Sequence, residues 1–193
     1  MKHFLLAFAL FLTAPLLHAQ KANEADTAPT LPIDSETHLI AYTSVKEIPD
    51  ATKAELYARG KVYFANAFKS AQNVIQADDR EAGLVIGKAW QQVYISSLGL
   101  SIPMKLWYTV KLAFKDGRYR YDVTDFMLEA SPSRYNYNPS PIAAERFTSL
   151  AKKDGTPTGM ASKHIRALDE AAHATITGLE ASMSKPAAGG KEW

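Results

Sequence analysis

The 193-residue sequence contains no cysteine. Disulfide bonds, cysteine nucleophiles, iron–sulfur clusters and cysteine-bound zinc are therefore all excluded. Charge of one sign is also scarce, because 22 Lys and Arg residues against 20 Asp and Glu residues leave a formal net charge of +2. The cations are not clustered strongly enough to indicate a nucleic-acid-binding surface, so we expect no nucleic-acid partner.

Long apolar runs are scarce as well, and the one at the N-terminus is short. Residues 4–12 are apolar without interruption, well short of the roughly 20 residues that span a bilayer. Lys2 and His3 precede this run and a less hydrophobic segment follows it, which is typical of a secretory signal peptide. We expect cleavage near Ala19, export to the periplasm or the extracellular space, and no stable membrane insertion.

Composition divides the remaining chain into three parts. Residues 20–35 are polar, contain two prolines and show no period, which predicts a flexible tether. Residues 184–193 predict a disordered tail on the same grounds. Residues 36–183 predict a single domain, which at this size can bury about two-thirds of its surface without disulfides.

Hydrophobic periodicity predicts an α+β fold. Thr52 and Glu55 have the spacing of a helix capping box, and Gly60 inside that helix predicts a close backbone contact, because glycine there costs about 1 kcal/mol relative to alanine. The element order is strand, helix, four strands, helix, which predicts an antiparallel sheet with helices packed on one face. The expected elements are strands at 38–48, 74–77, 84–95, 104–114 and 118–126, a loop at 96–103, and helices at 52–69, 140–153 and 160–184.

The segment KDGRYRYDVTDF, residues 115–126, predicts a β-hairpin. Asp116-Gly117 between two alternating runs favours a two-residue type I′ turn. Pairing outward from that turn gives one apolar face and one mixed face in a single register, and a slip of one residue would disrupt both faces. The apolar pairs are Phe114 with Tyr119, Leu112 with Tyr121 and Val110 with Val123; the mixed pairs are Ala113 with Arg120, Lys111 with Asp122, Thr109 with Thr124 and Trp107 with Phe126.

The last predicted helix carries a narrow apolar stripe. Its members recur at spacings of three and four, which favours packing against the sheet. They are Ile165, Leu168, Ala172, Ile176, Leu179 and Met183.

Two stretches of the sequence, VIQADDREAGLVIGKA (residues 74–89) and FKDGRYRYDVTDF (residues 114–126), resemble the signature stretches of a bacterial exported family. The family is domain of unknown function 4468, to which a TATA-binding-protein-like fold is assigned. LYARGKVYFANAFKS (residues 56–70) is also similar to it, and the resemblance covers roughly residues 33–129. It implies the same fold as the periodicity, but it implies no activity, cofactor or functional residue.

No motif in the sequence specifies a reaction, so we expect no catalytic residue, cofactor or metal. GLVIGKA, residues 83–89, has one residue too few for a phosphate-binding loop and lies inside a strand. His38, His164 and His173 show no metal-ligand spacing. Asp122 and Asp125 lie three apart on one strand, so their carboxylates point to opposite faces.

The mixed face of the sheet is the candidate binding surface. If both helices cover the other side, this face is open, and aromatic and cationic side chains on an open sheet can bind a ligand. The expected site residues are Trp107, Phe126, Lys111 and Arg120, with Trp90 or Tyr94.

These observations leave three hypotheses open. The first is a non-enzymatic exported binding module for an unknown protein, a peptide or a small amphiphile. The second is a carrier that holds a lipid or other hydrophobic ligand in a cavity between the sheet and the C-terminal helix. The third is a hydrolase that would need His164 and a distant aspartate in hydrogen-bond reach.

Overall fold

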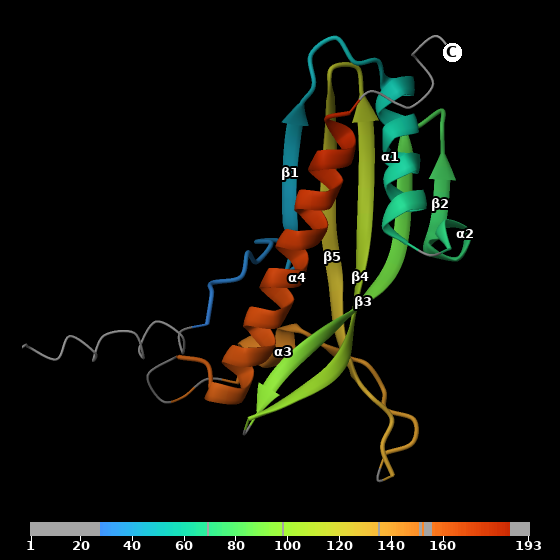
Figure 1. Ribbon diagram of the computed structural model, residues 1–193. Helices are drawn as coiled ribbons and strands as arrows, with labels where there is room; N and C mark the ends of the chain where they lie inside the picture. The colour runs from blue at the N-terminus through green and yellow to red at the C-terminus, as the bar shows by residue number, and fades with distance from the viewer. Residues whose placement is uncertain are drawn as a thin grey trace, which may run out of the picture.

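The structure is a computed structural model that describes residues 28–68, 70–97, 99–134, 136–150, 152 and 156–185. The predicted signal peptide, the predicted cleavage site and residues 186–193 of the predicted tail lie outside the described residues. Within them, a six-stranded antiparallel sheet has the order β1-β5-β4-β3-β2, with β6 also paired to β5. The two long helices, α1 and α4, lie on one face of this sheet (Figure 1).

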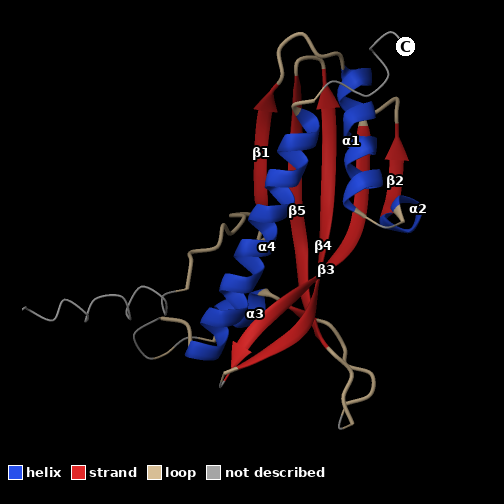
Figure 2. Cartoon of the chain, in the orientation of Figure 1, coloured by secondary structure: helices blue, strands red, loops and turns tan. Residues whose placement is uncertain are grey.

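The element order confirms the predicted α+β architecture, with two short helices and one short strand added (Figure 2). The sheet is strongly twisted, as sheets of long strands are, and the far ends of β3 and β4 sweep away from the other strands (Figure 1). The elements are β1 (Tyr42–Glu47), α1 (Lys53–Ala67), α2 (Ala71–Val74), β2 (Ile75–Asp79), β3 (Leu84–Ser97), β4 (Leu100–Lys115), β5 (Arg118–Ala130), β6 (Ile142–Ala143), α3 (Glu145–Thr148) and α4 (Gly159–Met183).

Helix α1 begins where the sequence predicts. The Thr52 hydroxyl accepts a hydrogen bond from the Glu55 amide at 3.2 Å, which satisfies one of the free N–H groups at the helix start. The predicted close contact at Gly60 is confirmed, since a Cβ atom there would lie 2.5 Å from the Phe114 ring. Glycine at this position therefore lets α1 approach β4 closely.

The β4–β5 hairpin is confirmed, with its register, from Lys115–Arg118 to Thr109–Thr124. Its turn differs from the prediction. Gly117 has a φ of 73°, but Asp116 is not among the described residues with positive φ, and a type I′ turn requires both. The Asp116 carboxylate instead accepts a hydrogen bond from the Lys53 amide at 2.7 Å, and the Gly117 amide donates to the Ala51 carbonyl at 2.8 Å. These tertiary bonds to the start of α1 decide the turn conformation.

A β-bulge corrects the prediction beyond Thr124. Trp107 pairs with Met127 rather than with Phe126, and the register shifts between Trp107 and Thr109. Asp125 has a φ of 55°, the left-handed conformation that aspartate tolerates better than most residues. The extra residue moves Phe126 from the outer side of the sheet to the core, where it is 1% exposed.

Residues 96–103 do not form the predicted loop. Strands β3 and β4 continue through this segment, and their last pair is Ser97 with Leu100. Pro103 is tolerated within β4 because the pairing of β4 with β5 stops at Met104. The missing N–H of the proline therefore falls on an edge of the sheet.

The prediction of a helix at residues 140–153 is also wrong. Residues 142–143 instead form β6 against Met127 and Leu128 of β5, and only the single-turn helix α3 follows. Strand β1 pairs with β5 only as far as Val123. The rest of that edge needs other partners for its backbone, and β6 supplies them.

The ordered domain begins before the predicted boundary at residue 36. Leu31 is 7% exposed, and Ile33 forms an antiparallel bridge with Ile40. The Asp34 carboxylate accepts hydrogen bonds from the Glu36 and Thr37 amides at 3.1 and 2.8 Å. Residues 31–35 are therefore packed on the domain rather than tethered loosely to it.

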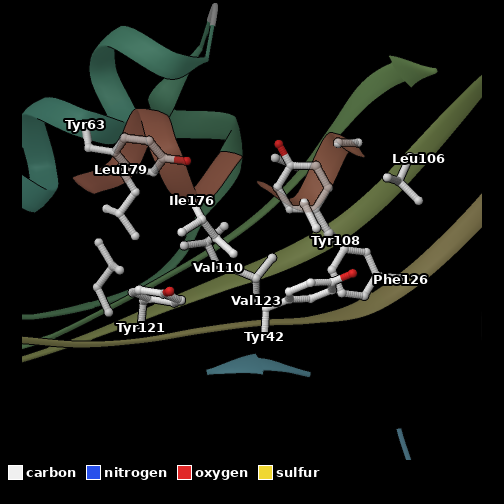
Figure 3. Packing of buried hydrophobic residues seen from close by; sticks show 14 of the residues in the cluster. Tyr42, Tyr63, Leu106, Tyr108, Val110, Tyr121, Val123, Phe126, Ile176 and Leu179 are labelled. Carbon is white, nitrogen blue, oxygen red and sulfur yellow. The ribbon is translucent and has the colours of Figure 1, made fainter. Parts of the chain in front are cut away.

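The core lies between the helices and the sheet (Figure 3). The whole predicted stripe of α4 is buried in it, from Ile165 to Met183. Polar contacts at the edge of the core also hold the helices. Arg59 of α1 donates a hydrogen bond to the Met183 carbonyl of α4 at 2.6 Å, and Lys46 of β1 pairs with Glu180 of α4 at 2.9 Å. Among the described helices, none has the length and apolar character that a membrane crossing requires.

Candidate functional site

The outer face of the sheet, the side away from α1 and α4, carries the candidate site. Side chains alternate between the two faces of each strand, so the strand registers fix which residues are neighbours on this face. Three cross-strand rows follow along it: Lys88 and Thr109 with Thr124, Trp90 and Trp107 with Met127, and Gln92 and Lys105 with Glu129.

Two tryptophans form the centre of the site. Trp90 and Trp107 are directly paired across β3 and β4, with ring centroids 6.2 Å apart and planes at 49°. Trp90 is 47% exposed, and Trp107 is half-buried. Aromatic cross-strand pairs stabilise a sheet by roughly 0.2–1 kcal/mol, yet this pair leaves a large apolar surface exposed to solvent.

Lys105 and Glu129 hold the tryptophan pair in place. Glu129 accepts a hydrogen bond from the Trp107 indole N–H at 2.7 Å and pairs with the Lys105 ammonium at 2.9 Å. The ammonium lies 5.5 Å from the centroid of Trp90 and 5.9 Å from that of Trp107, within range of a cation–π interaction. The hydrogen bonds from Lys105 and from Trp107 hold the pKa of Glu129 below its ordinary value. The cluster is therefore preorganised and internally neutral.

The structure brings only part of the predicted site together. Trp107 lies at its centre, and Trp90 and Tyr94 both point outward, which the sequence left open. Lys111 and Arg120 are on the same face, but toward the other end of the strands, and Arg120 is bonded to Asp122 at 2.7 Å. Phe126 does not belong to the site, because the bulge turns its side chain into the core beside Tyr42 and Tyr108.

The sequence prediction missed Lys105 and Glu129. Both belong to the same row, two residues beyond the Trp90 row along each strand. A signal for the bulge is present in the sequence: apolar residues occupy odd positions up to Val123 and even positions from Phe126 onward. That change of parity indicates an inserted residue, and it would have moved Glu129 onto the outer face.

Two cavities adjoin the site where β3 passes α1. The outer cavity, about 540 Å³, is lined by Phe68, Val74, Lys88, Trp90 and Trp107, with Ser70 and Asn73 supplying polar atoms. The inner cavity, about 210 Å³, lies between the sheet, α1 and α4, and includes Tyr63, Phe68, Gln91, Tyr108 and Thr175. Phe68 and Trp90 border both.

The histidines and carboxylates do not form a hydrolytic centre among the described residues. His164 is stacked on Phe147 with centroids 4.3 Å apart, and its Nδ1 lies 2.8 Å from the Met160 carbonyl. The Tyr42 hydroxyl donates to Asp169 at 2.6 Å, and His173 lies 3.5 Å from the same carboxylate.

Burial and the Asp169 carboxylate raise the pKa of Tyr42 above its ordinary value. The phenol therefore stays protonated and anchors α4 to β1 instead of supplying a nucleophile. Within the described part of the chain, no group of three or more His, Asp or Glu side chains is placed to hold a metal ion.

The fold defines an α+β protein in which two helices cover one face of a twisted antiparallel sheet, and no helix in the described part of the chain covers the other face. Residues 42–129, from β1 to β5, match the family described as a domain of unknown function (DUF4468) with TBP-like fold. The match spans β1 to β5 and includes α1.

Two solved structures are similar to this fold. A DUF4468 family protein from Bacteroides ovatus is 15% identical with a TM-score of 0.64, covering 88% of this chain and 99% of that one. A TBP-like protein from Parabacteroides distasonis is 11% identical with a TM-score of 0.54, covering 78% and 97%. No curated protein matches the sequence. These likenesses show the fold and assign no ligand.

Proposed function

We propose that this protein is an exported, non-enzymatic binding module that holds its ligand on the outer face of the sheet. The observation that carries the proposal is the tryptophan pair Trp90 and Trp107, exposed on an uncovered face and fixed by Lys105 and Glu129. Exposed aromatic side chains with polar neighbours are the residues that recognition surfaces favour. The N-terminal signal pattern supports export to the periplasm or beyond.

The carrier hypothesis receives less support from the cavities. A lipid carrier needs an apolar cavity between the sheet and the C-terminal helix. The cavity at that place has a volume of about 210 Å³ and is lined in part by polar side chains such as Gln91 and Thr175. Typical ligand pockets begin near 300 Å³, so this space does not suit a long hydrocarbon chain.

The proposal is tested by capture of the natural ligand. Native mass spectrometry of protein purified from its own cell envelope should show a co-purifying molecule or protein. The double variant Trp90→Ala with Trp107→Ala should lose it, because both aromatic surfaces are gone. Tyr137→Ala is the matched control, since Tyr137 is 90% exposed and lies in the loop between β5 and β6, outside the tryptophan pair.

Thermal unfolding of each variant separates loss of binding from loss of folding. We expect the control to retain its ligand and both variants to unfold cooperatively. Ligand retained by the double tryptophan variant would refute the outer face as the binding surface. A ligand found by mass to be a lipid, and lost on filling the inner cavity by Thr175→Leu, would favour the carrier.

A further inference from the structure

Strand β3 has an unpaired edge. On one side it pairs with β4 over its whole length, but on the other side β2 pairs with it only from Leu84 to Gly87. Residues 88–97 therefore have no second strand among the described residues, and every second residue there directs its N–H and C=O groups away from β4. Proteins normally blunt such an edge with charges, prolines or bulges.

The unpaired stretch KAWQQVYISS, residues 88–97, contains few of the features that protect a strand edge from pairing with another chain. Lys88 is its one charged residue, and Trp90 and Tyr94 are 47% and 59% exposed along it. An exposed, apolar and regular strand edge is a template on which another extended chain can add a strand.

The two cavities lie on opposite sides of this edge, at the end nearest β2. The outer cavity is bordered by Lys88 and Trp90, and the inner one by Gln91 and Thr175. Side chains of a strand added here would alternate between the two faces of the sheet. Successive side chains of one peptide would therefore enter the outer and the inner cavity in turn, which is how strand-adding sites obtain specificity.

The charge at the edge indicates an acidic occupant. Lys105 is neutralised by Glu129, whereas no acidic side chain pairs with Lys88 in the described part of the chain. A second copy of β3 is less suited, because residues 88–97 contain no carboxylate that could meet Lys88.

We propose that the unpaired edge of β3 binds an extended acidic peptide segment of another protein as an additional strand. An apolar side chain of the peptide enters the outer cavity against Trp90, and an acidic side chain on the same face pairs with Lys88. The neighbouring side chain enters the inner cavity beside Gln91. This inference rests on the proposed binding function and names the ligand class and the edge that receives it.

The test begins with random nine-residue peptides displayed on phage and selected on the purified full chain. The best peptide is then synthesised with single N-methyl groups at each backbone amide. In strand addition only every second peptide amide faces β3, so N-methylation should weaken binding in alternation, by about tenfold or more at the affected positions. Affinity can be followed by tryptophan emission in a Trp193→Phe background, which leaves Trp90 and Trp107 as the only reporters.

Two matched substitutions separate the edge from the face. Lys88→Gln should weaken an acidic peptide by about fivefold to tenfold. Lys115→Gln, which removes an exposed lysine at the hairpin end of the neighbouring strand β4, should change binding by less than about twofold.

Three results would overturn the proposal. They are selection of no peptide, N-methyl effects without alternation, and a protein dimer in sedimentation velocity whose formation protects the amides of residues 88–97. If a selected peptide binds without alternation and is lost in the double tryptophan variant, strand addition fails while the outer-face binding function stands. If neither a selected peptide nor a natural ligand binds, both fail.

Discussion

At the residue scale, single glycines and one carboxylate set the geometry around the site. Gly87 faces Phe64 of α1, and a Cβ atom there would lie 2.3 Å from the phenyl ring. The absence of a side chain lets α1 lie close to the point where β2 leaves β3. The position of α1 beside the outer cavity therefore depends on the absence of a Cβ atom at Gly87.

Substitution of Gly87 tests this close approach. Gly87→Ala should lower the free energy of unfolding by about 1–3 kcal/mol, because the methyl group overpacks against Phe64. Gly178→Ala is the matched control: a Cβ atom at this position of α4 would have open space around it, so the change should raise stability by up to about 1 kcal/mol through helix propensity. Urea unfolding followed by circular dichroism measures both, and equal effects of the two changes would contradict the packing argument.

The pH dependence of the site is set by Glu129. Hydrogen bonds from Lys105 and Trp107 hold its folded-state pKa below the ordinary 4.5. The stabilising contribution of this carboxylate is therefore fully present above pH 4.5 and is lost as the pH falls through the lowered folded-state pKa.

Tryptophan emission should report this titration directly. In a Trp193→Phe background we expect an emission change with a midpoint below pH 4.5, because the acceptor of the Trp107 indole N–H loses its negative charge. Glu129→Gln should abolish the change, since an amide oxygen accepts the indole bond at every pH. The same transition in the glutamine variant would assign it to another group.

At the element scale, the two edges of the sheet differ in how their backbone groups are satisfied. Strand β5 is covered by β1 along one half and by β6 farther along. Strand β3 is covered by β2 for a short part only. Among the described residues, β1 and β6 therefore pair with two parts of β5, whereas residues 88–97 of β3 have no second partner strand.

Amide hydrogen exchange should reveal this difference within β3. Amides in residues 88–97 that face away from β4 should exchange fast, and those bonded to β4 slowly, giving a period of two. At Val85 and Ile86, where β3 has strands on both sides, no such alternation is expected. Two-dimensional NMR exchange measurements would decide, and uniform protection over residues 88–97 would mean that another group already covers the edge.

The elements also show how far the sequence could predict this structure. The β4–β5 register was predictable from Lys115 to Thr109 because apolar and polar residues alternate there without a fault. Beyond Thr124 the sequence is compatible with the same register, because it would pair two aromatic residues, Trp107 and Phe126. This plausible pair hides the bulge. The turn type and β6 were unpredictable for another reason: both depend on tertiary hydrogen bonds, from Lys53 to Asp116 and along the edge of β5.

At the scale of the whole molecule, the two long helices act as one layer because a buried arginine joins them. Arg59 of α1 is 7% exposed, donates to the Met183 carbonyl at the end of α4, and pairs with Glu55 of its own helix. A basic group satisfies the free carbonyls at a helix C-terminus. The two helices that line the inner cavity, α1 and α4, are therefore held in a fixed relative position.

Removal of this arginine should loosen the helical layer. Arg59→Met keeps much of the side-chain volume but leaves the Met183 carbonyl without its donor, so the free energy of unfolding should fall by about 1–3 kcal/mol. Arg80→Met, at an exposed turn, should change stability by less than about 0.5 kcal/mol. Chemical denaturation of both variants provides the measurement, and an unchanged Arg59→Met protein would show that the apolar stripe of α4 alone holds the helices together.

The residue inserted at Asp125 divides β5 into two segments that are out of phase. In residues 118–124 the odd numbers point to the helices, and in residues 126–130 the even numbers do. Deleting Asp125 would rotate the second segment by half a turn, exposing Phe126 and Leu128 to solvent and driving Met127 and Glu129 inward. An alignment or a grafted sequence that ignores the inserted residue would place apolar side chains on the solvent face of the second segment and polar ones in the core. The two segments of β5 therefore have to be aligned or transplanted separately.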